Sequence, residues 1–248
     1  MTKTLAIDCG GGGIKGSVLD ENGAMLVPRI RLETPYPMSP EHFVDTLASL
    51  AARLPAADRA TIGMPGMIRH GIVIATPHYI TTAGPFTPID PDLPRRWDHW
   101  DAQSAISDHL GIPTRVVNDA EVHGAGVVRG EGLEVMFTLG TGLGCGLFDD
   151  GRLLPKLELS RAPVRKGVIY DAWVGDAARR ELGNKRWSTR VAKAIEGLRP
   201  MLLWDHLYVG GGNAKKLTVD LGPGVTLVPN EAGVTGGIRL WDLNEDKC

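Results

Sequence analysis

The chain has 248 residues but little cysteine and no long apolar run. Its three cysteines, Cys9, Cys145 and Cys248, are too few and too scattered for a disulfide framework or a zinc site. No apolar stretch approaches the roughly 20 residues that a membrane-spanning helix needs. The first residues also lack the charged-then-apolar pattern of a secretory signal. We therefore expect a cytoplasmic protein with no membrane partner.

A strong overall charge is also lacking, because 27 Lys and Arg residues stand against 29 Asp and Glu residues. A net charge of −2 argues against a nucleic-acid partner. The average hides a basic stretch over residues 152–199, which holds 12 Lys and Arg against 5 Asp and Glu. This stretch indicates either solvated helix faces or a patch that meets an anionic substrate.

Glycine is abundant, at 32 of 248 residues, where about 7% is usual. The glycines gather at residues 10–13, 140–146, 210–212 and 233–237. Clustered glycine between apolar runs indicates backbone that approaches a ligand closely. Hydrophobic residues make up 43% of the chain and charged residues 23%, which is typical of a globular protein with a sizeable core.

The first half alternates short apolar runs with glycine and proline, which predicts strands separated by turns. The expected strands are residues 4–8, 14–19, 25–32, 60–64 and 114–118. Ser39 and Pro40 mark the start of a helix over residues 40–54, where apolar residues recur at helical spacing. A second helix is expected over residues 98–110. Residues 75–97, rich in proline and threonine, predict a long loop of the kind that often serves function.

The second half repeats this organisation. The expected strands are residues 135–139, 145–148, a short strand after the Asp150-Gly151 turn, 207–209 and 225–228. The expected helices are residues 171–182, 187–199 and a terminal helix over 233–243. Because each half opens with a hairpin turned by glycine, the sequence predicts two duplicated α/β domains around a cleft.

The first glycine cluster fits a phosphate-binding hairpin. Residues 11–16 match G-x-G-x-x-G, but a dinucleotide-binding fold needs a helix after the glycines, and here a strand and the Asn22-Gly23 turn follow. A Walker A loop is excluded because no Gly-Lys-Ser/Thr follows. The hairpin leaves backbone N–H groups free to bind phosphate oxygens. The candidate phosphate ligands here are Gly10, Gly11, Gly12, Gly13 and Lys15. Asp8, at the end of the incoming strand, can hold Mg²⁺, and Lys15 is otherwise a surface lysine.

The second glycine cluster offers the same architecture. Gly140, Thr141 and Gly142 would add backbone donors and a hydroxyl. A plain tight hairpin is the alternative. Two such hairpins facing each other across a cleft would hold a polyphosphate from both sides.

Asn118 and Asp119 follow a predicted strand and precede a stretch of small residues. A carboxylate at the carboxyl end of a strand, beside a cleft, is well placed as a general base toward a hydroxyl. The alternative is that Asp119 caps a helix. His123, one helical turn later, is expected to be structural.

Together these segments resemble the ROK family (repressor, open reading frame, kinase) within the actin-like ATPase superfold. The segment from Asp8 to Lys15 resembles the family motif Asp-x-Gly-Gly-Thr-x-x-Lys, although Gly12 or Gly13 stands where threonine is usual. The other motifs with this resemblance are Asn118-Asp119-Ala120, residues 139–144 and Gly210-Gly211-Gly212-Asn213. The polyphosphate glucokinase branch is the most similar, through Glu158-Leu159, residues 163–167, Asp205-His206-Leu207-Tyr208 and Asn230-Glu231-Ala232-Gly233.

The resemblance implies two actin-like (ribonuclease H-like) domains around a central cleft, over residues 1–116 and 117–248, with the terminal helix packing back on the first. It implies a sugar kinase that uses ATP or inorganic polyphosphate with Mg²⁺, acts on a hexose-like hydroxyl through Asp119, and forms a homodimer. The implied nucleotide-side residues are Gly210, Gly211, Gly212 and Asn213. The implied sugar-binding residues are Asn118, Glu158, Arg161, Gly66 and His78.

The sequence departs from the family pattern at two places among the residues expected to bind the sugar. The family pattern Glu-Leu-Gly/Ala-His reads Glu158-Leu159-Ser160-Arg161 here, so that arginine replaces the histidine. The segment after Gly66, where the family often supplies an asparagine, reads Thr76-Pro77-His78-Tyr79. Arg161 would pair with an acidic acceptor or block the pocket. The alternatives are a nucleotide- or sugar-binding protein that has lost catalysis and a non-sugar actin-like kinase or ATPase.

Overall fold

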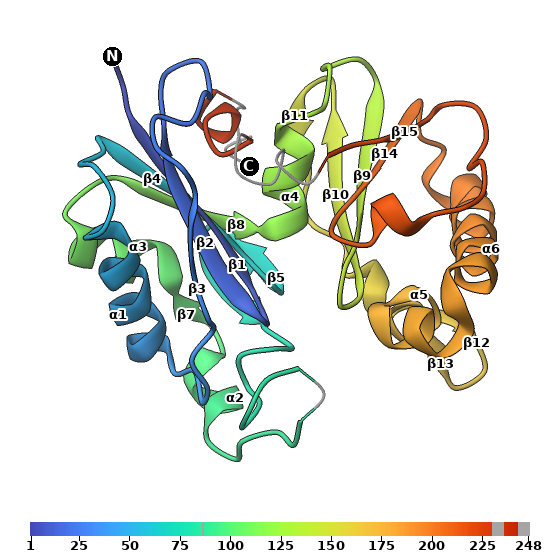
Figure 1. Cartoon of the computed structure of the whole chain (residues 1–248), viewed down its shortest axis with the longest axis horizontal. Helices are drawn as coiled ribbons and strands as arrows, with labels where there is room; N and C mark the ends of the chain where they lie inside the picture. Colours follow the sequence, from blue (N-terminus) through green and yellow to red (C-terminus); the bar gives the residue numbers. More distant parts are fainter. Residues whose placement is uncertain (86, 230–235, 243–248) are drawn as a thin grey trace.

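Two five-stranded sheets with the same strand order organise the molecule (Figure 1). The computed structural model describes residues 1–85, 87–229 and 236–242. The sheet orders are β3-β2-β1-β4-β8 and β11-β10-β9-β14-β15. In each sheet the first three strands are antiparallel and the last two run parallel to the central strand. The expected duplicated α/β fold of the actin-like type is thus confirmed.

The first sheet comprises β1 (Thr4–Gly10), β2 (Gly13–Leu19), β3 (Ile30–Leu32), β4 (Arg59–Met64) and β8 (Thr114–Asn118). Side chains alternate between its faces. Leu5, Ile7 and Cys9 pack into the core under α1 (Pro40–Ala51) and α3 (Ala102–Leu110). Ala6 and, by alternation, Asp8 face the other side. The outer face is therefore apolar, and the inner face presents Asp8 toward the second half of the molecule.

The second sheet comprises β9 (Leu133–Leu139), β10 (Leu143–Asp149), β11 (Arg152–Leu153), β14 (His206–Gly210) and β15 (Val225–Leu227). Its outer face packs against α5 (Tyr170–Val174) and α6 (Asp176–Leu202). Met136, Phe148 and Tyr208 point to the inner face, where they meet α4 (Asp119–Ala125). Because successive strand residues point to opposite faces, the outer face of this sheet contributes to one hydrophobic core and its inner face to another.

The remaining elements are short. They are β5 (Met67–Arg69), β6 (Ile72–Ala75), α2 (Leu93–Trp97), β7 (Trp100–Asp101), η1 (Leu159–Arg161), β12 (Pro163–Arg165), β13 (Val168–Ile169), η2 (Ala214–Lys216) and η3 (Arg239–Trp241). None of the described helices is long and apolar enough to cross a membrane.

Helix α4 lies between the two sheets (Figure 1) and contacts strands of both. It approaches β10 closely because Gly144 and Gly146 lack side chains. A Cβ atom on Gly146 would lie 3.1 Å from the carbonyl oxygen of Ala120, and one on Gly124 would overlap the Phe148 ring. Glycine at these positions sets the depth at which the helix, and Asp119 at its start, enters the molecule.

The end of the described chain returns to the first sheet. Ile238 joins Ala6 and Leu19 in a small buried cluster. The Trp241 indole N–H donates to Thr61 Oγ1 at 2.9 Å, and the guanidinium groups of two arginines lie over its ring. The polypeptide thus crosses to the second sheet and comes back, so both ends of the described chain are fixed to the same sheet.

Several expected elements have different bounds. The third strand covers only Ile30–Leu32 of the expected 25–32, because Pro28 interrupts pairing after an isolated Met25 bridge. The helix expected over 98–110 begins at Ala102, since Trp100 and Asp101 pair with β6 instead. The expected loop over 75–97 contains α2.

Helices α5 and α6 replace the helices expected over 171–182 and 187–199. Helix α6 extends over parts of both, but the backbone of Gly183 is non-helical (φ 73°, ψ 159°), so two helical segments meet there, close to the predicted break between residues 182 and 187. Of the terminal helix expected over 233–243, only residues 236–242 are described, and within them only Arg239–Trp241 are helical, as the 3-10 turn η3. Residues 230–235 and 243–248, which include Asn230-Glu231-Ala232-Gly233 and Cys248, lie outside the described residues.

The packing of α4 on β10 predicts a large cost for Gly146→Ala. The added methyl would press on the backbone of Ala120 and Glu121, so we expect a loss of about 1–3 kcal/mol, typical of overpacking. Gly197→Ala on α6 is the matched control, because a Cβ there meets nothing within 4 Å. That change should stabilise the protein by about 0.5–1 kcal/mol. Urea unfolding measures both, and equal effects would contradict the close approach.

Candidate active site

A cavity of about 230 Å³ opens between the two sheets. Both glycine hairpins, the start of α4 and the segment before η1 line it. The sequence-predicted residues that line the cavity are Asp8, Gly10, Gly11, Lys15, Gly66, His78, Asn118, Asp119, Gly140, Thr141, Gly142, Glu158, Gly211 and Gly212. Gly12, Gly13, Arg161, Gly210 and Asn213 are not among the lining residues. Segments far apart in sequence therefore meet at one place.

Asp8 and Lys15 stand opposite each other on β1 and β2. Lys15 Nζ lies 3.3 Å from Asp8 Oδ2, and about a quarter of each side chain is exposed. The two charges thus balance each other at the cavity wall while keeping access to solvent.

Side chains from the segment after β3 hold the turn of the first hairpin. Thr34 Oγ1 donates to the Gly10 carbonyl at 2.7 Å, and Tyr36 OH donates to the Gly11 carbonyl at 2.9 Å. Because the carbonyl groups are engaged from outside, the turn keeps a fixed conformation.

The departure from the family's threonine coincides with an arginine at this turn. The Arg31 guanidinium donates to the Gly12 carbonyl. It occupies the space that a Cβ on Gly13 would fill, at 2.6 Å from its Nε. Gly12 is exposed, and a Cβ there would meet nothing within 4 Å. Glycine at position 13 is therefore needed for Arg31 to lie where it does.

Asp171 braces the second hairpin, and no local sequence pattern pointed to it. Asp171 Oδ1 accepts a hydrogen bond from the Leu143 N–H at 2.8 Å, and a Cβ on Gly142 would overlap that oxygen. Burial raises the pKa of Asp171, and the hydrogen bond from Leu143 opposes this rise. Asp171 also lines the cavity, as a further carboxylate besides Asp8, Asp119 and Glu158.

Asn118, and not Asp119, caps helix α4. Its side-chain oxygen accepts from the Ala120 N–H at 2.9 Å, and its amide nitrogen donates to the Gly66 carbonyl at 2.9 Å. Gly66 has φ 126° and would collide with the Ala75 carbonyl if it carried a Cβ. The side chain of Asn118 is thus committed to the backbone, and the helix-cap alternative for Asp119 is wrong.

Asp119 is the first residue of α4 and faces the cavity. Burial, reinforced by the charge of Asp8, raises its pKa to about 6, while the ammonium of Lys156 and a hydrogen bond from the Ala120 N–H oppose the rise. Glu158 adds a smaller upward effect. A carboxyl group with a pKa near neutrality is suited to taking up and releasing a proton.

Only some of the residues expected to bind the sugar line the cavity. His78 and Glu158 line the cavity, and Ser160 Oγ donates to Glu158 Oε1 at 2.5 Å. Burial lowers the pKa of His78, so it is neutral at physiological pH, with Glu158 opposing this. Arg161 is exposed and does not reach the lining. Its contact with an acceptor stays a prediction.

Lys156 also lines the cavity, and sequence reasoning missed it. The side chain is 4% exposed, and Nζ donates to the Cys145 carbonyl at 3.1 Å. Its position two residues before Glu158, on the segment already expected to bind an acceptor, was the available signal. His123, expected to be structural, contacts the Pro229 carbonyl at 3.0 Å and also borders the cavity.

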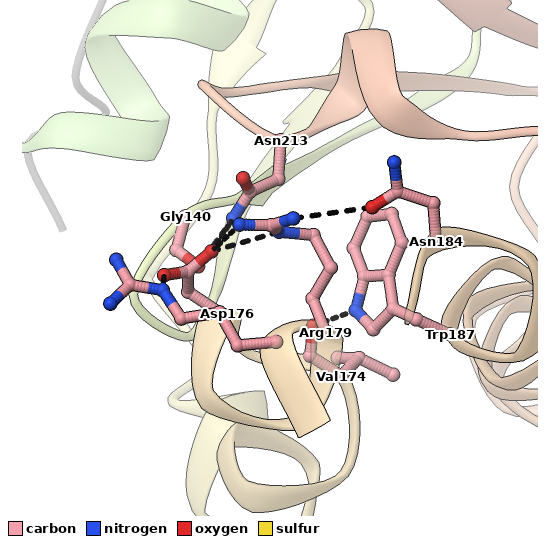
Figure 2. A network of polar contacts seen from close by, with 8 residues as sticks. Gly140, Val174, Asp176, Arg179, Asn184, Trp187 and Asn213 are labelled. Atoms are coloured by element: carbon pink, nitrogen blue, oxygen red, sulfur yellow. Dashed lines mark hydrogen bonds and ion pairs between the residues drawn. The ribbon is translucent and has the colours of Figure 1, made fainter. Parts of the chain in front are cut away.

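The third glycine motif meets the second hairpin through a polar network (Figure 2). Asn213 Nδ2 donates to the Gly140 carbonyl at 3.2 Å and to Asp176 Oδ1 at 3.1 Å. Asp176 is also paired with Arg179 at 2.8 Å and with Arg180 at 2.6 Å. Asn213 therefore lies behind the hairpin and fixes Gly140 from outside the cavity.

The same network fixes the start of α6. The backbone N–H of Asp176 donates to the Gly140 and Thr141 carbonyls. Burial alone would raise the pKa of Asp176, but hydrogen bonds from Arg179 and Asn213 outweigh it and lower the pKa. Arg179 also donates to Asn184, beyond the Gly183 kink (Figure 2). One carboxylate thus joins the second hairpin, the third glycine motif and α6.

Comparisons with known proteins show what the chain is similar to. A family model described as "ROK family" matches residues 4–155. A polyphosphate glucokinase from Mycobacterium tuberculosis (strain CDC 1551 / Oshkosh) is 28% identical over 224 residues, which cover 86% of this chain and 78% of the relative.

Two solved structures have the same fold. An inorganic polyphosphate/ATP-glucomannokinase from Arthrobacter sp. strain KM has a TM-score of 0.81 and 27% identity, covering 98% of this chain and 99% of that chain. A ROK family glucokinase from Streptomyces griseus, in complex with glucose and AMPPNP, has a TM-score of 0.74 and 18% identity, covering 96% and 98%. Its likeness supports the fold alone.

The network predicts that Asp176→Ala lowers stability by about 1–3 kcal/mol, because it leaves the partly buried Arg179 and Asn213 without their acceptor. Arg180→Ala is the control: its side chain is 77% exposed, so we expect less than about 0.5 kcal/mol. The stabilisation by Asp176 should be complete above pH 3.8, the ordinary pKa of Asp, and be lost as pH falls through its lowered pKa. Urea unfolding at several pH values tests this, and equal losses for both variants would contradict it.

Proposed function

The chain belongs to the ROK family, and we propose from this that it is a sugar kinase that transfers a phosphoryl group from ATP or inorganic polyphosphate to a hydroxyl of a hexose-like sugar. Its relatives are phosphotransferases with a hydroxyl acceptor. One observation carries the proposal. Two glycine hairpins from two sheets, and one carboxylate of raised pKa from the helix between them, line a single cavity.

Asp119 is the proposed general base. It must be ionised to accept the proton of the acceptor hydroxyl, and with a pKa of about 6 it is ionised at neutral pH. The proton moves from the hydroxyl to the carboxylate as the hydroxyl oxygen bonds to phosphorus and the donor's bridging oxygen leaves with the remaining phosphates. Asn118 positions this base by capping α4 and by binding the backbone at Gly66.

The glycine hairpins are the proposed donor site. Gly10 and Gly11 of the first hairpin and Gly140–Gly142 of the second line the cavity. The backbone N–H groups of both turns would meet the donor phosphates there, apart from that of Gly140, which donates to the Gly142 carbonyl. Such groups stabilise phosphoryl oxygens without reorganisation. Lys15 adds a charge that offsets those of the phosphates.

Asp8 fits a Mg²⁺ ion that the donor phosphates share. The described residues contain no cluster of three metal-ligating side chains, and Mg²⁺ in kinases characteristically takes one or two carboxylates, with waters and phosphates as its other ligands. Asp8, part-exposed at the cavity wall, supplies such a carboxylate. The ion, when bound, neutralises charge that develops on the phosphates.

The acceptor would lie beside Asp119, against His78, Glu158 and Asp171. Carboxylates accept hydrogen bonds from sugar hydroxyls, and all three side chains line the cavity. The domain boundary at residues 116 and 117, the homodimer and the cytoplasmic location remain predictions.

Asp119→Asn should lower kcat by about 100- to 10,000-fold, because the amide cannot take the proton. The KM for ATP should change little, since Asp119 does not belong to either glycine hairpin. In the unchanged protein, kcat/KM should fall as pH drops below about 6, the pKa of Asp119. A panel of hexoses with ATP or polyphosphate provides the assay. Turnover by the variant at the rate of the unchanged protein would exclude Asp119 as the base.

The basic helix α6 predicts how the two donors differ. Arg180, Lys185, Arg186 and Lys193 are exposed on it, and α6 begins at the network behind the second hairpin. A long polyphosphate would reach these charges, whereas ATP is too short to need them. The KM for polyphosphate should therefore rise more steeply between about 0.05 and 0.5 M salt than the KM for ATP. Equal salt sensitivity would show that these residues form only a solvated helix face.

A further inference from the structure

The side chain of Lys156 is an ammonium in the interior without a carboxylate partner. It is 4% exposed, and no ion pair of Lys156 is present among the described residues. An ammonium has three N–H donors, and the structure engages one of them, with the Cys145 carbonyl. A charge in the interior is costly unless its hydrogen bonds are satisfied. Two donors are therefore left to the cavity that Lys156 lines.

The edge of β10 explains why Lys156 points inward. Strand β11 pairs with β10 only at Phe148 and Asp149, so the Cys145 carbonyl has no strand partner on that side. The chain runs back along this edge after Leu154, whose N–H donates to the Leu147 carbonyl at 2.9 Å. Lys156 then supplies to Cys145 the donor that a neighbouring strand would give, which brings its ammonium to the cavity.

Lys156 lies in the part of the cavity where the acceptor is proposed to bind, near Asp119, Glu158 and Asp171. The other ammonium group in the lining, that of Lys15, is on the first hairpin and pairs with Asp8. Lys156 is two residues from Glu158, and its charge acts on Asp119 and Asp171. The carboxylates there can only accept hydrogen bonds, whereas Lys156 can only donate them. A ligand with both hydroxyl donors and oxygen acceptors matches this set.

We propose that Lys156 contacts the substrate: its ammonium donates hydrogen bonds to oxygen atoms of a polyhydroxylated acceptor held against Asp119. This rests on the proposed sugar kinase function. It assigns acceptor recognition on this segment to Lys156 and Glu158, beside the exposed Arg161, whose charge also acts on Asp171. The acceptor class is one that carries an oxygen beside the reacting hydroxyl, as hexoses and sugar acids do.

The charge of Lys156 has a second consequence, for the ionisation of Asp119. The charged groups that act on Asp119 are Asp8 from β1, Lys156 and Glu158, and the thiol of Cys9 and the phenol of Tyr79 nearby are neutral because burial raises their pKa values. Of these groups, Lys156 alone favours the carboxylate. Its removal raises the pKa of Asp119, so the acid limb of the rate profile moves to higher pH.

The test compares Lys156→Met with Lys166→Met, a lysine that is exposed and outside the cavity. With D-glucose and ATP, Lys156→Met should raise the KM for glucose about 10- to 100-fold, the effect of a lost hydrogen bond to a charged group. The KM for ATP should stay within about twofold, and the acid limb of kcat/KM should shift to higher pH. Lys166→Met should match the unchanged protein in all three.

A rescue experiment separates contact with the substrate from support of the Cys145 carbonyl. Ethylamine added to Lys156→Ala should restore part of the turnover in proportion to its concentration, because the small cation can enter the vacated space. A purely structural role gives lower thermal stability with no rescue and an unchanged KM for glucose, and that result would overturn the proposal.

Calorimetric titration with glucose distinguishes failure of the proposed kinase function from failure of the proposed Lys156 contact. If the unchanged protein binds glucose but transfers no phosphoryl group, the proposed function fails, and weaker binding by Lys156→Met still supports the contact. If both bind equally, the contact is refuted whether or not transfer occurs. If no sugar of a panel of hexoses and sugar acids binds to the unchanged protein, both proposals fall.

Discussion

The close packing of one short helix, α4, against the inner face of the second sheet is the constraint on which the rest depends. Gly124 on the helix and Gly146 on β10 leave no room for a side chain between them. Asn118 fixes the start of the helix to the backbone at Met64 and Gly66, at the end of the first sheet. The same seven-residue helix is thus held by both sheets, and Asp119 can lie only at the cavity between them.

This placement determines the pKa of Asp119. Burial and the neighbouring Asp8 make the charged form of Asp119 less favourable, and Lys156 opposes both effects. A free carboxyl group would be a weak base at neutral pH, whereas a buried one without a cation nearby would be protonated. The balance between these influences comes from three separate elements, β1, α4 and the segment before η1, and no one of them provides it alone.

Much of the fold could be predicted from local patterns. Glycine between two apolar runs predicted both hairpins, and Ser39 with Pro40 marked the start of α1, where Ser39 accepts a hydrogen bond from the backbone N–H of His42. Patterns failed where tertiary contacts decide. Trp100 and Asp101 pair with β6 and so delay α3. By contrast, the break predicted between residues 182 and 187 agrees with the non-helical backbone of Gly183, where two helical segments of α6 meet.

The sequence by itself determined the residue types proposed to carry the chemistry: two glycine turns, Asp8, and Asp119 after a strand. These signals are local, because a turn, a cap or a strand end involves only a few consecutive residues. Only the tertiary structure decided which side chains share the cavity. It brought in Lys156 and Asp171, left Arg161 exposed, and placed Asn213 behind the second hairpin. The physical reason is that burial and charge pairing depend on neighbours across the sheets. Asp8 and Asp119, for example, are more than a hundred positions apart in the sequence. No periodicity along the chain can predict such a contact.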